Sequence, residues 1–244
     1  MRTEAPFQLE DLADLDARLY SKAEAVVPMR EIAIGQTDPH VLGLRHDVDN
    51  FIEPAVAMSS WEAERGYRST YFILHTAPYW QDKTLLRESL ETIAGHGHEI
   101  GFHLNAITAA IETGRDPVEI LLEDLAELRS YGYAVTGVVA HGDHACYRHN
   151  FVNDELFTES ARPSYGAPDR IVGGIQLLPV SRSAFDFDYD PNWLPRGKYL
   201  SDSGGKWSQP FDAVADGFPF EGQTHLLVHA DWWTEAFAKV EIAA

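Results

Sequence analysis

The stretch VLGLRHDVD at residues 41–49 decides the fold, because a run of apolar residues there leads directly into two carboxylates. The apolar run predicts a buried β-strand, and the Glu53-Pro54 pair predicts the start of a helix that ends at Gly66. A second strand, STYFILH, is expected over residues 69–75. A strand, a helix and a further strand in this order indicate two parallel neighbours in one sheet.

The same alternation continues along the chain. Asp82 predicts the cap of a helix that carries Leu86, Leu90 and Ile93 and ends at Gly95 or Gly97. HEIGFHL at 98–104 predicts a third strand. Asp116-Pro117 predicts the start of a further helix, and VTGVVAH at 135–141 predicts a fourth strand. This alternation favours an α/β fold with a parallel sheet, either closed as a barrel or open and doubly wound. In both architectures the site lies where the carboxyl ends of the strands meet.

The remaining segments carry a weaker pattern. An amphipathic helix is expected from Leu9 onward, and the later, Pro- and Gly-rich sequence predicts strands only near residues 176–181 and 198–201. THLLVHAD at 224–231 predicts a final strand. Because no internal repeat or linker interrupts the sequence, we expect one domain over residues 1–244.

The composition excludes several classes of protein. The 38 Asp and Glu residues outnumber the 19 Lys and Arg residues, and the formal net charge of −19 disfavours binding to nucleic acid or anionic lipid. The single cysteine, Cys146, allows no intramolecular disulfide and is expected to be a small buried hydrophobic residue. No segment has the roughly 18 apolar residues of a membrane span, and the first residues lack the apolar stretch of a secretory signal. We therefore expect a cytoplasmic protein without a membrane span.

Residues that bind metals or exchange protons follow each of the predicted strands. They are Asp47 and Asp49, His75, His103 and Asn105, His141, and His229 and Asp231. A lone histidine is more often structural than a ligand, but this regular placement favours a shared site. Imidazole and carboxylate suit zinc, iron, cobalt, nickel or manganese, and the lack of further cysteines argues against a sulfur-rich structural zinc site.

Three short blocks resemble the motifs of the NodB-type polysaccharide deacetylases, the carbohydrate esterase family 4 group. The blocks are HDVD at 46–49, GHEIGFH at 97–103 and LLVHADWW at 226–233. Together with SDSGG at 201–205, they are most similar to the WbmS-like subgroup, which is associated with surface-polysaccharide gene sets. The resemblance spans roughly residues 41–233 and implies a distorted (β/α) barrel of the NodB type.

The resemblance also implies roles for single residues. Asp47 corresponds to the catalytic base, Asp49 and His103 to metal ligands, and His229 to the general acid. A divalent metal lowers the pKa of its bound water to about 7 and polarises the substrate carbonyl. Asp47 would then remove the proton of the attacking water, and His229 would protonate the departing sugar amine.

Two positions depart from the family pattern. The family's second metal histidine falls four residues after the first, where this chain has Ile107, which cannot bind a metal. We expect His141, at the end of the next strand, to replace it, with His144 and Asp143 of the same loop as further candidates. The arginine that orients the base is also missing from AHGDHA at 140–145. The alternatives in this chain are Arg45, Arg148 and Arg182.

The implied cofactor is one divalent metal ion, with zinc expected first and iron, cobalt, nickel or manganese as alternatives. The implied partner is an acetylated carbohydrate substrate. Asn105, Trp232 and Trp233 are the residues expected to bind it. Tyr79 and Trp80 are further aromatic residues that would stack on a sugar, unless they are buried at the rim of the barrel.

Three functions stay open at this point. The first is a metal-dependent deacetylase acting on an N- or O-acetylated sugar, including a lipid-linked or nucleotide-linked precursor. The second is another metal-dependent barrel hydrolase, an amidohydrolase or a phosphoesterase, although the His-x-His strand signature of amidohydrolases is missing around Asp47. The third is a relative that binds carbohydrate without catalysis, which Ile107 motivates. The oligomeric state is not predicted.

Overall fold

The computed structural model describes residues 1–160 and 169–243, and the chain divides into two compact units. The first unit contains Met1–Phe72, Ala77–Ile100 and the chain from Trp193 onward, and the second contains Ile73–Thr76 and Gly101–Asn192. The expectation of a single domain stays a prediction.

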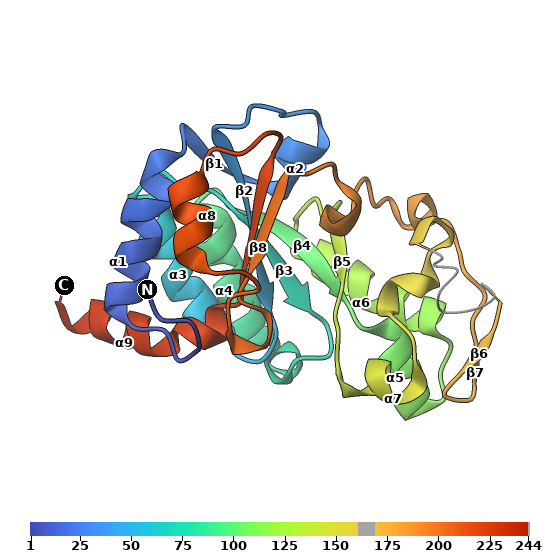
Figure 1. Ribbon diagram of the computed structural model, residues 1–244. Coiled ribbons are helices and arrows are strands. Elements are labelled where there is room, and N and C mark those ends of the chain that lie inside the picture. The colour runs from blue at the N-terminus through green and yellow to red at the C-terminus, as the bar shows by residue number, and fades with distance from the viewer. Residues whose placement is uncertain (161–168, 244) are drawn as a thin grey trace. The chain divides into compact units, whose positions relative to one another are not determined.

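The strands form a parallel sheet within a mixed α/β fold (Figure 1). Their order is β5-β4-β3-β2-β9-β8, with β1 paired to β2. The pairs β1–β2, β2–β9, β8–β9 and β4–β5 are parallel. No pairing joins β5 to β8 within the described residues, so the sheet has two edges, as an incomplete (β/α) barrel has. The predicted parallel sheet is confirmed, and the NodB type of barrel stays a prediction. The strands are β1 (Ala25–Pro28), β2 (Val41–Val48), β3 (Thr70–Leu74), β4 (Glu99–Leu104), β5 (Val138–Ala140), β8 (Lys198–Ser201) and β9 (Thr224–Val228).

Strand β2 is the centre of the first unit and is buried along its whole length. An apolar run with both faces covered is typical of a strand inside a parallel sheet. At Gly43 a Cβ atom would lie 3.0 Å from Cγ1 of Ile32 and 3.2 Å from Sδ of Met29. Glycine therefore lets α2 (Met29–Ala33) pack directly on the strand.

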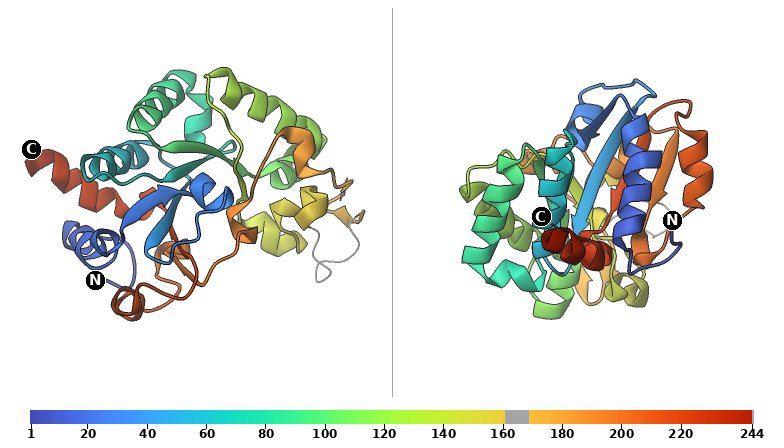
Figure 2. Two further views of the ribbon diagram at one scale, coloured as in Figure 1. Left: turned by 90° about the horizontal axis from the view of Figure 1, so that it is seen from above. Right: turned by 90° about the vertical axis from the view of Figure 1, so that its left-hand side faces the viewer.

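The helices of the first unit surround these strands. They are α1 (Leu9–Arg18), α2, α3 (Glu53–Glu64), α4 (Lys83–Gly95), α8 (Phe211–Gly217) and α9 (Thr234–Ala243). As predicted, the Asp82 carboxylate caps α4 by accepting hydrogen bonds from two backbone N–H groups of its first turn. Figure 2 shows α3 and α4 packed side by side. Arg18 of α1 forms ion pairs with Asp212 and Asp216 and so ties α1 to α8.

The second unit contains α5 (Ala106–Thr113), α6 (Pro117–Ser130), α7 (His144–His149) and a short hairpin of β6 (Ile171–Val172) and β7 (Ile175–Gln176). Asp116 caps α6, as the sequence predicted. At Gly137, beside β5, a Cβ atom would lie 2.5 Å from the Tyr189 ring, so only glycine allows this contact.

Most predicted elements are confirmed, and the strand expected over residues 176–181 is wrong. Gln176 ends β7, and Val180 forms only an isolated bridge to Phe157. Pro179 lies between them and has no N–H to donate to a strand ladder. The predicted fourth strand is also shorter, since β5 begins at Val138. The elements that were not predicted from the sequence include the strands β1 and β6 and the helices α2, α5, α7, α8 and α9.

None of the helices in the described part of the chain combines the length and apolar character needed to cross a bilayer.

Candidate metal centre

Strand β2 carries charged side chains at its carboxyl end. Arg45 and Asp47 are buried, and Arg45 Nε lies 3.5 Å from Asp47 Oδ1. The Arg45 guanidinium carbon also lies 6.0 Å from the centre of the Phe72 ring on β3. Asp49 follows the strand and is partly exposed. Of the three arginines considered as partners for the predicted base, Arg45 thus forms an ion pair with Asp47.

Strand β9 leads into His229, which the buried carboxylate of Asp202 orients. His229 donates to Asp202 from Nδ1 at 2.7 Å and from its backbone N–H at 2.9 Å. Trp233 Nε1 donates to the same carboxylate at 3.0 Å. The other ring nitrogen of His229, Nε2, lies 3.9 Å from Asp49 Oδ2.

The surroundings of His229 favour its charged form. Burial lowers the pKa of the imidazole, but the hydrogen bond to Asp202 and the charges of the nearby carboxylates outweigh burial and raise this pKa to about 9. Because Nδ1 donates to Asp202, the second proton of the imidazolium lies on Nε2. His229 therefore holds a proton at neutral pH on the nitrogen nearer to Asp49.

Asp231 holds the loop that follows Asp49. Its carboxylate accepts hydrogen bonds from the backbone N–H of Asn50 at 3.0 Å, from Asn50 Nδ2 at 2.7 Å and from the backbone N–H of Phe51 at 3.1 Å. Burial raises the pKa of Asp231, while these bonds act in the opposite direction. Asp231 therefore positions the loop next to Asp49.

In the second unit, β4 and β5 bring two imidazoles face to edge. His103 Nδ1 donates to the carbonyl oxygen of Val139 at 3.0 Å, so Nε2 of the neutral ring carries a lone pair. His141 Nδ1 lies 3.2 Å from that Nε2, and the two rings are inclined at 84°. The backbone N–H of His141 donates to the carbonyl of Leu104 at 2.8 Å, and this hydrogen bond holds His141 beside the end of β4. With His103 Nε2 as the acceptor, His141 Nδ1 donates the hydrogen bond between the two rings, and a cation bound by both nitrogens would replace the shared proton.

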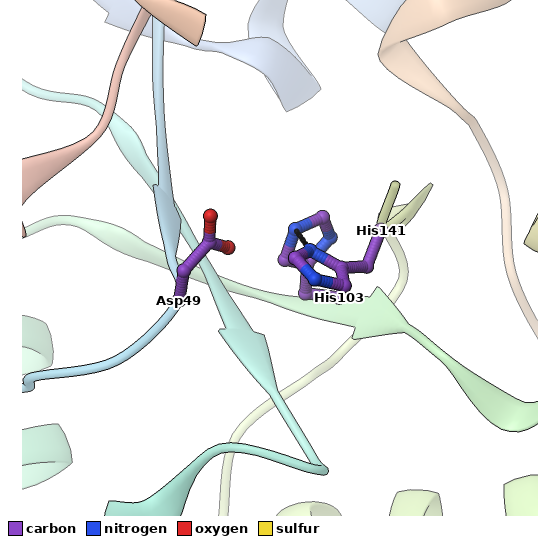
Figure 3. Close-up of side chains that lie close together, drawn as sticks. All are labelled: Asp49, His103 and His141. Atoms are coloured by element: carbon purple, nitrogen blue, oxygen red, sulfur yellow. Dashed lines mark hydrogen bonds between the residues drawn. The ribbon is translucent and has the colours of Figure 1, made fainter. Parts of the chain in front are cut away.

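Figure 3 shows these two imidazoles together with the Asp49 carboxylate. One ligand atom from each of Asp49, His103 and His141 lies within 4.8 Å of the other two. His103 is buried, and the other two residues are partly exposed. This is a possible metal-binding cluster, and its members are the three ligands expected from the sequence. That they bind a metal stays a prediction.

His75 follows β3 and differs from these histidines in its partners, because its ring nitrogens bond to a carboxylate and to a backbone N–H group of the second unit and not to another imidazole. Nδ1 lies 2.7 Å from Asp124 Oδ2, and Nε2 accepts from the backbone N–H of Asn105 at 2.9 Å. Burial lowers the pKa of His75, with Asp124 acting against it. The Asn105 side chain is also used internally, since Nδ2 donates to Thr76 and Oδ1 accepts from Asn153. Binding of a sugar by Asn105 stays a prediction.

Sequence reasoning missed two buried residues that position the histidines. Asn153 Nδ2 donates to the His141 carbonyl at 3.0 Å, and its Oδ1 accepts from the backbone N–H of Ile107 at 3.0 Å. The other residue is Asp202, which stands in the SDSGG block without a predicted role. A carboxylate directly after a predicted strand is the signal that could have identified Asp202. Asn153 begins a short 3-10 helix (Asn153–Leu156), and no pattern in the sequence around it marks it out.

Most of the aromatic residues expected near a sugar belong to the core. Trp233 is fully buried, and its ring stacks on Phe7 with 4.5 Å between centroids. Tyr79 and Trp80 are buried as well, which agrees with the alternative that they are rim residues. Trp232 is partly exposed and is therefore the expected stacking residue that retains a free surface.

No protein-family model matches the chain, and no curated protein matches it either. The NodB-type deacetylases therefore remain a resemblance in three short blocks.

Proposed function

We propose that this chain is a metal-dependent hydrolase that removes an acetyl group from an N- or O-acetylated sugar. The observation that carries the proposal is the pair of adjacent imidazoles of His103 and His141, which form a possible three-residue metal-binding cluster with Asp49. Asp47 supplies a buried carboxylate two residues before Asp49, and His229 supplies a protonated imidazole beside it.

The two histidines fit a divalent metal ion. Two nitrogens that each lie about 2.05 Å from a tetrahedral zinc ion are about 3.3 Å apart, close to the 3.2 Å between His103 Nε2 and His141 Nδ1. The hydrogen bond from His103 Nδ1 to a backbone carbonyl fixes the ring and its tautomer, as is usual for histidines that bind metals. Two imidazoles and one carboxylate also leave a coordination position open for catalysis.

When bound, a divalent cation would polarise the acetyl carbonyl and make water more acidic. Asp47 accepts the proton of the attacking water, and the ion pair with Arg45 holds its carboxylate in place. The water oxygen bonds to the acetyl carbon, and the bond from that carbon to the sugar nitrogen or oxygen breaks. The products are acetate and a free sugar amine or hydroxyl group.

His229 suits the second half of this reaction. Its Nδ1 proton is held by Asp202, so the Nε2 proton is the one available for donation. Expelling an amine requires a proton on nitrogen, and a cationic imidazole supplies it at neutral pH. Asp202 acts through His229 and is therefore a positioning residue.

The test combines metal analysis with acetate release. Protein stripped with a chelator is reloaded with zinc, iron, cobalt, nickel or manganese, and then given N-acetylglucosamine oligomers and O-acetylated sugars. We expect about one ion per chain and release of acetate that depends on it. His141→Ala should lose both properties, whereas His40→Ala, which changes an exposed histidine elsewhere, should keep them. Failure to bind any of these ions would reject the metal site, and bound metal without acetate release from any substrate would reject the hydrolase.

A further inference from the structure

Helix α7 begins three residues after His141 and is attached to it through the backbone. The carbonyl oxygen of His141 accepts a hydrogen bond from Asn153 Nδ2 at 3.0 Å and lies 4.0 Å from Cys146 Sγ. Asn153 Nδ2 also lies 3.6 Å from Cys146 Sγ. Burial raises the pKa of the Cys146 thiol to about 11, so the inner side of α7 is neutral and packed. The first turn of α7 is therefore held next to the backbone of His141.

The outer side of α7 carries His144, Tyr147 and Arg148. Residues spaced three and four apart share one face of a helix, so these side chains are neighbours. All three are exposed, and Tyr147 keeps 86% of its surface open to solvent. Within the described part of the chain, no hydrogen bond or ion pair joins any of the three side chains to another residue. We call these three side chains the α7 face.

The acidic residues nearest to the α7 face in sequence do not neutralise it. Asp143 accepts a hydrogen bond from the backbone N–H of Cys146 at 3.0 Å and caps α7. Burial acts to raise the pKa of Asp143, but its hydrogen bonds lower it overall. Glu155 is buried and forms an ion pair with Arg170, 2.9 Å away. The α7 face is thus a local cationic and aromatic surface.

This surface stands out because the whole chain has a formal net charge of −19. Such a charge repels anions from most of the surface, so an anionic substrate needs a local exception in order to bind. An unpaired arginine next to an exposed tyrosine provides one, since a guanidinium binds phosphate through two parallel hydrogen bonds. The tyrosine ring offers an apolar surface for a sugar ring, and the His144 imidazole adds a further donor.

We propose that the α7 face binds the phosphate group of a phosphorylated acetylated sugar, and thereby selects anionic substrates for the neighbouring site. This inference rests on the proposed function, because it names the substrate class of the same site. Arg148 and His144 contact the phosphate, and Tyr147 packs on the sugar. The three side chains affect substrate binding and take no part in the chemical step.

The test compares N-acetylglucosamine 1-phosphate with N-acetylglucosamine on the metal-loaded protein. Arg148→Gln should raise KM for the phosphorylated sugar by at least about 10-fold, the loss typical of one charge-assisted hydrogen bond, while kcat stays within about 2-fold. KM for the neutral sugar should not change. The matched control is Arg30→Gln, which removes another exposed arginine from a helix of the first unit and should leave both KM values unchanged. Tyr147→Ala should raise KM for both sugars.

Calorimetry of the same two sugars with wild type and Arg148→Gln separates this inference from the proposed function. Weaker binding of the phosphorylated sugar by Arg148→Gln would support the α7 face even if no sugar were deacetylated. Three results would overturn it: equal binding of the phosphorylated sugar by both proteins, an equal KM increase for the neutral sugar, or the same effect in Arg30→Gln.

Discussion

A histidine stands at the end of β3 and at the ends of β4 and β5, but the ring nitrogens of these histidines have different hydrogen-bond partners. His75 uses one ring nitrogen to bind Asp124 and the other to accept from Asn105. His103 Nδ1 donates to the Val139 carbonyl, and the partner of its Nε2 is Nδ1 of a second imidazole, His141. A position at the end of a parallel strand therefore brings a histidine to the carboxyl-terminal edge of the sheet, and we expect the partner of its second ring nitrogen to decide its role.

The difference between His75 and His103 is tested by replacing each histidine in turn. His103→Ala should remove nearly all bound metal, because it deletes the buried ligand of the cluster. His75→Ala should keep about one ion per chain but lower the free energy of unfolding by roughly 2–4 kcal/mol, since it leaves a cavity and unpaired hydrogen-bonding groups. Metal content and urea unfolding measured on both variants check this. Full metal retention in His103→Ala, or metal loss in a folded His75→Ala, would show that the partner of the second ring nitrogen does not distinguish a metal ligand from a structural histidine.

The next largest effect is expected at the end of β2, where Asp47 and Asp49 carry the same carboxylate but different proposed tasks. Asp47→Asn should lower turnover by roughly 100-fold or more, the range typical of losing a general base, with metal content preserved. Asp49→Asn should instead weaken metal binding. Turnover like that of wild type in Asp47→Asn would remove Asp47 from the base role. A large loss of stability with little change in rate would mean that Asp47 serves mainly as the partner of Arg45.

The confirmed strands show which parts of the fold are predictable from sequence. Residues 41–49 combine a long apolar run with a clear helix start after it, and β2 was predicted to within one residue. By contrast, β1 has four residues and was missed, because so short a run carries no measurable period. Helix α5 was missed because its residues are mostly apolar, without the polar positions that reveal a helical face. Residue types at strand ends were predictable as well, since parallel strands end at one edge of a sheet.

The distant residues that hydrogen-bond to these histidines could not be predicted in the same way. Asp202 is 27 residues from His229, Asp124 is 49 residues from His75, and Asn153 is 12 residues from His141. Such pairs form only when the chain has folded, and no local spacing encodes them. Burial was equally hidden for Trp233, whose sequence context is the same as that of the partly exposed Trp232.

A smaller effect is expected at His229, whose proposed role differs from that of the two histidines of the proposed metal site. If His229 donates a proton to the leaving group, His229→Ala should lose at least about 10-fold more activity on an N-acetyl sugar than on an activated acetate ester, whose leaving group needs no proton. If His229 instead binds the metal or packs the end of β9, both substrates should suffer equally. Both rates are measured on samples of known metal content. Equal losses would reject the acid role and leave Asp231 or a water molecule as the proton source.

The smallest expected effect concerns the free energy of unfolding and the pair of His229 and Asp202. The pKa of His229 is about 9 in the folded protein, above the 6.5 of a free histidine, so the folded state binds more protons between these values. The stabilisation is therefore complete below about pH 6.5 and is lost as the pH rises through about 9. Asp202→Asn removes the charge that holds the proton. The free energy of unfolding of wild type should therefore exceed that of the variant at pH 6, and this excess should shrink by on the order of 2–3 kcal/mol at pH 9.5. Urea unfolding of chelator-treated protein measures this difference. Groups that titrate equally in both proteins contribute equally and cancel.

The metal is removed because a cation near Asp49 would disfavour the proton on His229. If the difference in free energy of unfolding does not change with pH, Asp202 serves only as an acceptor for uncharged donors such as Trp233, and His229 is not protonated by its interaction with Asp202.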